Sequence, residues 1–456
     1  MTVKREVERL EHSAVRLKLT IGKDDVREEY DEIIKDYAKK IQIPGFRKGK
    51  APRDVLVRKF ADAFQAETLA HVVEHSVSDV FSDTSFPEED RPLPYSQPQV
   101  DGEMPELNLE ADLSFAVVYD VFPRFAVGTW QGLELAVKDA AVTEEDIARE
   151  LEAVRERNAV VLDRDDGAAA KAGDVATVNY AEITAEGGAV PGTEREDFVF
   201  TIGTGANLFH FDDEVTGMKK GETKDFEKTY GEDFADKDLA GQTKKIRVTL
   251  TALKERQLPA LDDDLAQDVD EKYQTLEDLK KDIREKLAKN LESRRRDLRV
   301  HAILDKVLET TPIDLPESMM RIELESRWRA LARQFNADPA QLAELMNRGE
   351  RSQSAVFDEW RPDVARAIKS RLIVESLVKE RGFNAPDEEI EKEYETIAAD
   401  SNMKLDDVKA YYGQGSMKDY LAEDLKERKL FDLLLAENTI KPGEMVKYLD
   451  LLSNNG

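Results

Sequence analysis

The hydrophobic period changes along this chain, and the change limits the folds that are open to it. Between about residues 173 and 253, apolar and polar side chains alternate in short runs that glycines separate. This pattern is typical of a small antiparallel sheet. Downstream of this region, apolar residues recur mostly at helical spacing. The length of 456 residues also favours several domains over one core.

The first part of the chain is predicted to be an α+β domain. Residues 14–21 alternate between apolar and polar side chains, as a half-buried strand does. Residues 26–41 and 55–80 carry apolar side chains at helical spacing, and residues 113–122 are predicted to form another strand. We place the end of this first domain near residue 112.

Residues 43–52 form a loop between the two predicted helices. Phe46 lies beside Arg47 and Lys48, so an aromatic ring and two cations occupy the centre of the loop. An exposed phenylalanine is unfavourable unless a partner receives it. Glycines that permit sharp turns and prolines that stiffen the ends surround the centre: Pro44, Gly45, Gly49 and Pro52. We therefore interpret the loop as a docking tip.

Charge supports this interpretation. The chain carries 67 Lys and Arg against 96 Asp and Glu, a net charge of −29. Between Lys39 and Lys59, however, eight basic residues accompany only one acid, Asp54, which gives this segment +7 and leaves −36 for the remainder. A local cationic segment on an acidic protein can bind nucleic acid at that place alone. The alternative is a solvated basic hairpin.

The run from Gly45 to Pro52 resembles the ribosome-docking loop of the bacterial trigger factor family. Members of this family are ribosome-associated chaperones with an embedded peptidyl-prolyl isomerase domain. The resemblance implies that the loop touches a ribosomal protein and large-subunit RNA at the polypeptide exit tunnel. The ribosome-binding residues that it implies are Gly45, Phe46, Arg47, Lys48, Gly49 and Lys50.

The resemblance runs along almost the whole chain and implies an α+β multidomain fold. Residues 1–112 would form an α+β ribosome-binding domain. Residues 113–166 would connect it to the next domain and pack with the C-terminal domain. Residues 167–255 would form an FKBP-like antiparallel sheet domain with isomerase activity. Residues 256–456 would form an all-α chaperone domain with arms that binds substrate.

The chemistry of the middle domain requires no nucleophile, metal or cofactor. Rotation about an X–Pro bond is slow because the amide has partial double-bond character. A pocket that removes water from the amide favours the less polar, twisted transition state. By position against the FKBP-like pattern, the residues that would line this catalytic pocket are Tyr180, Phe198, Leu208, Phe211 and Phe234. The alternative is that they are core residues of a small sheet.

Two turns of the middle domain depart from the FKBP-like pattern. The usual Pro-Gly before the short helix is Phe209-His210 here, and the usual Thr-Gly after the first strand is Ala181-Glu182. The aromatic frame is kept, but the turn residues are not. This leaves open whether the domain isomerises prolyl bonds or mainly binds prolyl peptide.

The helical part carries large apolar residues that could contact unfolded clients. Thioether and aromatic side chains suit a surface that accepts many partners. Residue type cannot separate such a surface from a buried core, and a core role is favoured for most of them. The candidates are Met319, Met320, Trp328, Phe335, Met346, Phe357 and Trp360.

The expected partners are the large ribosomal subunit and unfolded nascent polypeptides. We expect a cytoplasmic location and no membrane partner, because no apolar run approaches the roughly 20 residues of a membrane span. A homodimer away from the ribosome is left open. The absence of cysteine excludes disulfides and a cysteine nucleophile.

Two other functions are weighed against this one. In the first, the protein is a free prolyl isomerase whose flanking domains only recruit substrate. In the second, it is a zinc hydrolase, because residues 71–75 match the H-x-x-E-H pattern. The zinc site is disfavoured because no separate feature identifies the further acidic ligand that it needs.

Overall fold

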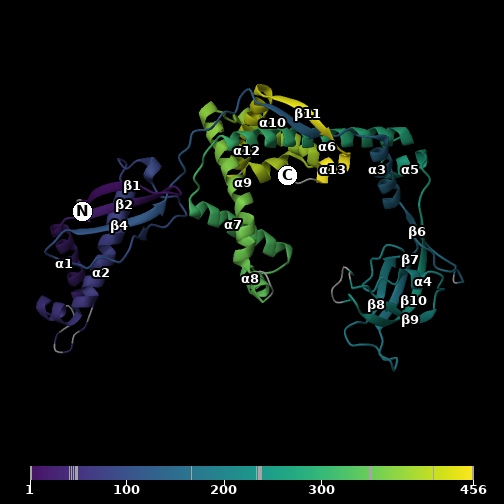
Figure 1. The fold of residues 1–456 in the computed structure, drawn as a ribbon, viewed down its shortest axis with the longest axis horizontal. Helices are drawn as coiled ribbons and strands as arrows, with labels where there is room; N and C mark the ends of the chain where they lie inside the picture. The colour runs from purple at the N-terminus through teal and green to yellow at the C-terminus, as the bar shows by residue number, and fades with distance from the viewer. Residues whose placement is uncertain are drawn as a thin grey trace. The chain divides into compact units, whose positions relative to one another are not determined.

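The computed structural model describes residues 3–40, 42, 44, 46, 50–165, 167–232, 234, 239–348, 352–413 and 415–453. The chain divides into two compact units, which we describe separately. The first contains Met1–Val137 and Asp297–Pro442, and the second contains Lys138–Arg296 and Gly443–Gly456. Figure 1 shows their helices and strands.

The first unit begins with an antiparallel sheet. Its strands are β1 (Val3–Arg9), β2 (Ala14–Ile21), β3 (Gln99–Val100) and β4 (Leu113–Asp120), in the order β1-β2-β4-β3. The predicted alternation of β2 is confirmed, because every second side chain is fully buried: Val15, Leu17, Leu19 and Ile21. One face of β2 therefore belongs to the core and the other faces solvent.

The predicted boundary at residue 112 lies one strand too early. We had assigned residues 113–166 to a connecting segment, but β4 pairs with β2 along its whole length, from Leu113 opposite Ile21 to Asp120 opposite Ala14. Strand pairing between residues so distant in sequence cannot be inferred from the local period of either strand. The N-terminal sheet therefore includes β4.

Two helices cover this sheet and lead to the predicted docking loop. They are α1 (Lys23–Lys40) and α2 (Arg53–Ser82), and a short 3-10 helix (Glu88–Asp90) follows. Phe60 departs from helical geometry, with φ −129° and ψ 25°. A kink at this residue therefore separates the first two turns of α2 from the rest of the helix. Near the loop, the two helices share a small core made of Tyr30, Ile33, Ile34, Leu56 and Phe64.

The rest of the first unit is helical. It contains the later part of α6 (Leu276–Glu309), which crosses the division between the units, and six further helices. These are α7 (Glu317–Gln334), α8 (Pro339–Asn347), α9 (Gln353–Arg381), α10 (Asp387–Ser401), α11 (Leu405–Tyr412) and α12 (Ser416–Glu437). Side chains at helical spacing on α6, α7, α9 and α12 form its main core, including Ile303, Val307, Leu324, Ile368, Leu372, Leu430 and Leu434.

Most of the apolar residues that we considered for client binding are not exposed. Met319, Met320 and Trp328 are buried. The Trp328 indole donates a hydrogen bond to the Pro339 carbonyl (3.0 Å) and packs beside Phe357. Met346, Phe357 and Trp360 are half-buried. Only Phe335 of this set is exposed, at 66%.

The second unit contains a five-stranded sheet. Its strands are β6 (Val160–Asp163), β7 (Val175–Glu182), β8 (Arg195–Thr201), β9 (Thr223–Thr229) and β10 (Thr243–Gln257). The order is β6-β10-β7-β8, and β9 also pairs with β10. Because β6 precedes residue 167 and pairs with residues 254–257, the sheet extends beyond the predicted segment of residues 167–255 at both ends.

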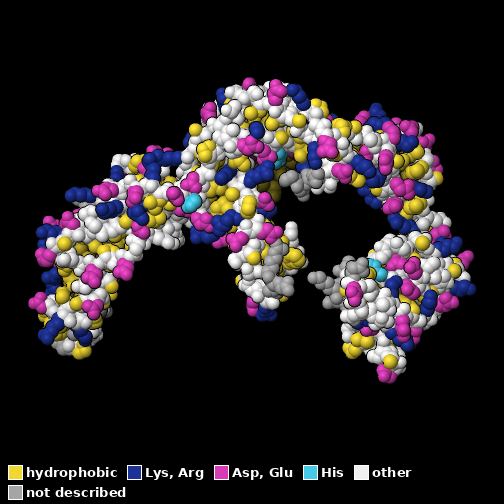
Figure 2. Space-filling model, in the orientation of Figure 1, with side chains coloured by type: hydrophobic (Ala, Val, Ile, Leu, Met, Phe, Trp, Pro, Cys, Tyr) yellow, Lys and Arg dark blue, Asp and Glu magenta, His cyan; other side chains and the backbone are white. Residues whose placement is uncertain are grey.

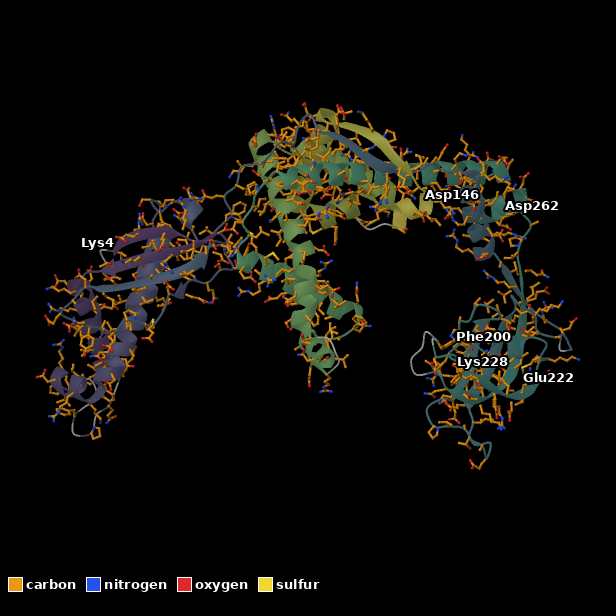
Figure 3. The ribbon with its side chains drawn as sticks, viewed as in Figure 1. Lys4, Asp146, Phe200, Glu222, Lys228 and Asp262 are labelled. Atoms are coloured by element: carbon orange, nitrogen blue, oxygen red, sulfur yellow. The ribbon has the colours of Figure 1, made fainter. Side chains whose placement is uncertain are left out.

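The second unit also contains the first part of α6 and these shorter helices: α3 (Glu144–Arg157), α4 (Asp212–Val215), α5 (Asp263–Val269) and α13 (Tyr448–Ser453). Side-chain caps fix the starts of two of them (Figure 3). Thr143 and Asp146 form a reciprocal capping box at α3, and the Asp262 carboxylate accepts a hydrogen bond from the Leu265 amide at α5. Strand β5 (Glu134–Asp139) pairs with β11 (Thr439–Met445).

The surface mixes charges of both signs with small apolar areas (Figure 2). No helix among the described residues is both long and apolar enough to cross a membrane.

A close backbone contact in the first unit provides a test of this packing. A Cβ atom at Gly128 would lie 2.7 Å from the Thr310 carbonyl oxygen, whereas a Cβ at Gly22 would meet nothing within 4 Å. We expect Gly128→Ala to lower the free energy of unfolding of this unit by about 1–3 kcal/mol through overpacking. Gly22→Ala is the matched control, with an effect within about 0.5 kcal/mol. Denaturant unfolding measures both, and equal stability of the two variants would contradict the close approach.

Candidate functional site

An aromatic cluster lies in the core of the five-stranded sheet. The Tyr180 ring on β7 contacts the rings of Phe198, Phe209 and Phe211 edge-to-face, with centroids 5.5, 5.9 and 5.1 Å apart. Phe211 also contacts Phe200, at 5.6 Å. Edge-to-face packing of this kind adds to the stabilisation that burial provides. The sheet and the loop before α4 together hold the cluster.

The five residues predicted for the pocket differ in their surroundings. Tyr180 and Phe211 are buried in the core of the sheet, while Phe198 and Phe234 are half-buried against that core. Leu208 is 47% exposed and lies outside the core cluster. The structure therefore gives Tyr180 and Phe211 the packing of core residues, and it leaves parts of Phe198 and Phe234 accessible. Their roles in catalysis stay predictions.

Sequence reasoning missed Tyr230, which ties the pocket loop to the end of β9. Its hydroxyl donates a hydrogen bond to the Phe209 carbonyl (2.8 Å), and its ring contacts Phe234 at 5.0 Å. Burial raises the pKa of Tyr230 to about 12, with help from the charges of Glu214 and Glu182. The hydroxyl therefore stays protonated and available as a donor at neutral pH. The alternation of apolar and polar residues does not single out Tyr230, because this residue lies just after the end of β9.

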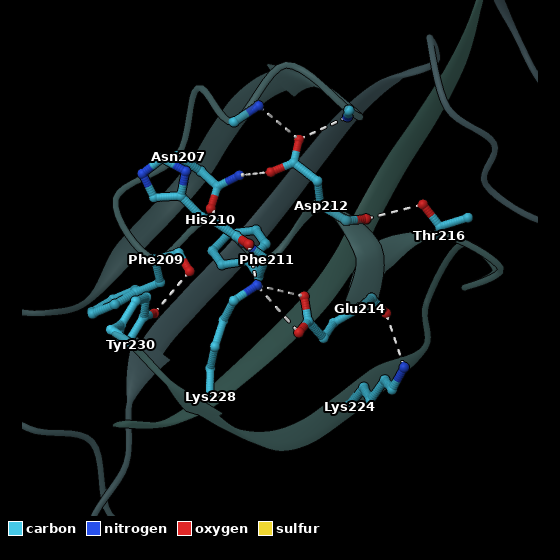
Figure 4. A network of polar contacts seen from close by, with 12 residues as sticks. Asn207, Phe209, His210, Phe211, Asp212, Glu214, Thr216, Lys224, Lys228 and Tyr230 are labelled. Atoms are coloured by element: carbon cyan, nitrogen blue, oxygen red, sulfur yellow. Dashed lines mark hydrogen bonds and ion pairs between the residues drawn. The ribbon is translucent and has the colours of Figure 1, made fainter. Parts of the chain in front are cut away.

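His210 stands where the FKBP-like pattern has glycine, and the backbone explains the difference. Its φ of +50° lies in the left-handed region that favours glycine. Contacts with Asn207, Lys228 and Phe234 hold the strained residue, and Figure 4 shows the first two of these partners. Its amide donates to the Asn207 carbonyl (3.1 Å), its carbonyl accepts from the Lys228 ammonium, and its ring lies 5.2 Å from that of Phe234. The turn therefore keeps its conformation without glycine.

The buried Asp212 carboxylate organises the same loop (Figure 4). It accepts hydrogen bonds from the Gly203 amide (2.7 Å), the Gly205 amide (3.2 Å) and the Asn207 side-chain amide (2.7 Å). The side-chain oxygen of Asn207, Oδ1, in turn accepts from the Phe211 amide (2.8 Å). Burial favours the neutral acid, but these donors together outweigh burial and hold the pKa of Asp212 below its ordinary value of 3.8.

This arrangement can bind an apolar group but offers little for covalent chemistry. The rings of Phe198 and Phe234 are half-buried, and the polar groups of Asn207, Asp212 and Tyr230 are occupied in holding the loop. Among the described residues, no group of three or more His, Cys, Asp or Glu is placed to hold a metal ion. The geometry suits a reaction that requires desolvation of a bound amide.

The predicted docking loop lies partly outside the described residues. Gly45, Arg47, Lys48 and Gly49 belong to the part that is not described. Phe46 is 37% exposed, and Lys50 is also exposed. The aromatic ring at the centre of the loop is therefore accessible, as docking requires.

Several cations near this loop lack acidic partners. Lys39 and Arg53 form ion pairs with Asp36 and Asp31. Four other cations of the basic segment form no ion pair with any described residue: Lys40, Lys50, Arg58 and Lys59. Arg58 and Lys59, together with Asp54 and Val55, also line a surface hollow of about 490 Å³ at the start of α2. Unpaired cations keep their full charge available for an anionic partner.

The histidines of the H-x-x-E-H pattern are packed together on α2. The rings of His71 and His75 stack with centroids 4.2 Å apart, and His71 Nδ1 faces Glu29 of α1 at 2.5 Å. Stacked rings direct their nitrogen atoms along parallel planes instead of toward one shared ion. The pair therefore has a packing role between the two helices.

The role of Asp212 can be tested by Asp212→Asn. The folded chain favours the ionised form, so its contribution to stability is present above pH 3.8 and is lost as the pH falls through the lower pKa of the folded state. We expect the variant to lower the free energy of unfolding of the second unit by about 1.5–3 kcal/mol at neutral pH. The deficit should shrink below pH 3.8.

Asp213→Asn is the matched control, because Asp213 is the exposed neighbour on the same helix. Urea unfolding at several pH values, followed by the fluorescence of the tyrosines, measures both variants. A pH-independent deficit would contradict the assignment of Asp212 as an ionised anchor.

Family models match three consecutive parts of the chain. Residues 3–154 match the model of the bacterial trigger factor protein, and residues 275–436 match the model of the C-terminus of bacterial trigger factor. Between them, residues 167–251 match the FKBP-type peptidyl-prolyl cis-trans isomerase model.

Relatives match over their full length. A trigger factor of Treponema denticola is 44% identical over 454 residues, which are 100% of each chain. A trigger factor of Treponema pallidum is 36% identical over 452 residues, 99% of each chain. A solved structure described as "Promiscuous Substrate Recognition in Folding and Assembly Activities of the Trigger Factor Chaperone" aligns over 95% of this chain and 99% of that chain. Its TM-score of 0.50 at 24% identity shows a shared fold.

Proposed function

This chain belongs to the bacterial trigger factor family, and from that premise we propose that it is an ATP-independent chaperone that docks on the ribosome and shields nascent polypeptides. The observation that carries the proposal is the order of the matched parts. One chain joins a trigger factor N-terminal part, an FKBP-type isomerase domain and a trigger factor C-terminal part. A free prolyl isomerase would not require the first and last of these.

Docking is assigned to the loop around Phe46. The exposed ring of Phe46 would enter an apolar niche of a ribosomal protein, while cations bind phosphates of large-subunit RNA. The residues proposed for this contact are Gly45, Phe46, Arg47, Lys48, Gly49 and Lys50. Support comes from the exposure of Phe46 and from the unpaired cations beside it. Attachment near the exit would raise the effective concentration of nascent chains and strengthen weak client contacts.

The middle domain is a peptidyl-prolyl isomerase domain of the FKBP type. We assign its pocket to the five predicted residues, with Phe198, Phe234 and Leu208 as the accessible side and Tyr180 and Phe211 as the floor. An apolar pocket accelerates rotation by binding the twisted, less polar amide more tightly than the planar one.

Client contact is assigned to exposed apolar side chains of the helical part. Several large apolar residues are at least half exposed, and charged residues separate them (Figure 2). Scattered contacts of this kind bind many unfolded sequences weakly. The proposed residues are Phe335, Leu345, Met403, Tyr411 and Tyr420.

The remaining assignments follow from family membership. We propose a cytoplasmic location, and we retain the FKBP-type domain and the helical chaperone domain of the predicted division. The first boundary moves beyond β4, and the FKBP-type sheet gains β6. Self-association into a homodimer remains a prediction.

The docking assignment can be tested by replacing Phe46, Arg47 and Lys48 together with alanine. We expect co-sedimentation with ribosomes to fall at least about tenfold, because one apolar anchor and two phosphate contacts are lost. The fold should be unchanged, as circular dichroism would show. The matched control replaces Phe122, Lys4 and Lys18, a ring and two cations that are also exposed in the first unit. Equal pelleting of both variants would remove the docking assignment.

The isomerase assignment can be tested by Phe198→Ala, with Val199→Ala as the matched control. Val199 is the next residue on β8 and is 59% exposed on the opposite face. We expect Phe198→Ala to lower kcat/KM for a Phe-Pro peptide about tenfold or more, and Val199→Ala to leave it unchanged. Proline isomerisation assays measure both. Robust turnover without ribosome affinity would favour the free isomerase.

A further inference from the structure

The edge of the sheet in the second unit contains an unusual strand. Three consecutive aliphatic residues of β6 are exposed: Val160 at 55%, Val161 at 46% and Leu162 at 45%. The strand lies at the end of the sheet order and pairs only with β10. An exposed edge strand with apolar side chains is a ready template for another strand.

The edge strands β1, β8 and β9 carry charges that discourage such pairing. Strand β1 contains Lys4, Arg5, Glu6, Glu8 and Arg9, and β9 contains Lys224, Asp225, Glu227 and Lys228. Strand β8 begins with Arg195, Glu196 and Asp197. Among the described strands, β6 alone presents three exposed aliphatic residues in succession. Charges therefore protect β1, β8 and β9, whereas β6 presents an open aliphatic edge.

The register shows which backbone groups point outward. Arg164 lies opposite Leu253, and its amide donates a hydrogen bond to the Leu253 carbonyl (3.1 Å). In an antiparallel pair, bonded and non-bonded positions alternate. The amide and carbonyl groups of Val161 and Asp163 therefore point away from β10, toward the open edge. An extended chain lying there would find two donors and two acceptors beside aliphatic side chains.

We propose that β6 binds an extended apolar segment of an unfolded polypeptide by strand addition. This inference rests on the proposed chaperone function and gives it a second kind of client contact, which uses main-chain hydrogen bonds. Such bonds are independent of side-chain sequence, while the aliphatic residues select for apolar segments. The site therefore suits a protein that must accept many clients.

The size and charge of the site favour a client over a second copy of this chain. Four residues of strand span only about 13 Å. Pairing along that length buries far less than the roughly 1,000 Å² of a stable protein interface. Two copies, each with net charge −29, would also repel one another. A short edge instead suits weak and reversible contact with an unfolded chain.

The proposal can be tested with Val161→Pro in the full-length chain. Proline removes the outward amide of Val161 without breaking a bond to β10, and edge strands tolerate it. The probe is a dye-labelled peptide of alternating valine and threonine with lysine at both ends, and binding is followed by fluorescence anisotropy. We expect Val161→Pro to weaken binding about tenfold, since it loses a hydrogen bond and obstructs the edge. The control Val161→Thr keeps the amide and should stay within about twofold of the wild type.

Hydrogen exchange on the unaltered chain provides a second measurement. Adding the peptide should protect the amides of Val161 and Asp163, while the same peptide with alternate N-methylated residues should protect neither. Unchanged binding by Val161→Pro, or no protection of these amides, would overturn the proposal. Self-association of the wild type that Val161→Pro abolishes would also overturn it, in favour of a second copy. Val161→Pro should co-sediment with ribosomes as the wild type does. Failure of the strand-addition proposal can therefore be distinguished from failure of the docking proposal.

Discussion

Repulsion between an acidic chain and RNA is the constraint on which this account of the molecule depends. A net charge of −29 keeps most of the surface away from phosphate, so attachment to a ribosome requires cations that carboxylates do not neutralise. The structure meets this requirement near the start of α2. Lys40, Lys50, Arg58 and Lys59 have no ion pair among the described residues, although acids are abundant elsewhere. Docking at one place and repulsion elsewhere follow from the same charge distribution.

The middle domain uses a negative charge for a different purpose. There, the buried Asp212 carboxylate accepts hydrogen bonds from three donors of the loop before α4: Gly203, Gly205 and Asn207. That loop keeps a left-handed turn even though histidine replaces glycine at position 210. The polar network supplies the rigidity that glycine and proline provide in the usual turn, so the aromatic frame survives a change of turn residues. In the pocket that we propose, this rigidity would help to exclude water from a bound amide.

Local patterns predicted the elements well, whereas the docking role of the loop around Phe46 stays a prediction. The predicted alternation of β2 is present, because the period of a strand depends on neighbours in sequence. The place of β4 was mispredicted because pairing with β2 joins residues about a hundred positions apart. Trp328 could not be assigned to core or surface, since a helical period identifies an apolar face but not what covers it. Whether β6 has an open edge depends on which strands lie beside it, and the residues of β6 do not indicate those neighbours.

The central claim is that unpaired cations attach an acidic chaperone to ribosomal RNA. The most direct test is the dissociation constant of the full-length chain for purified ribosomes, measured across a series of potassium chloride concentrations. Each phosphate contact releases a counterion, so the four unpaired cations together with Arg47 and Lys48 of the proposed contact predict that the logarithm of the affinity falls linearly with the logarithm of salt concentration, with a slope of about −4 to −5. An affinity that does not change with salt would contradict the claim.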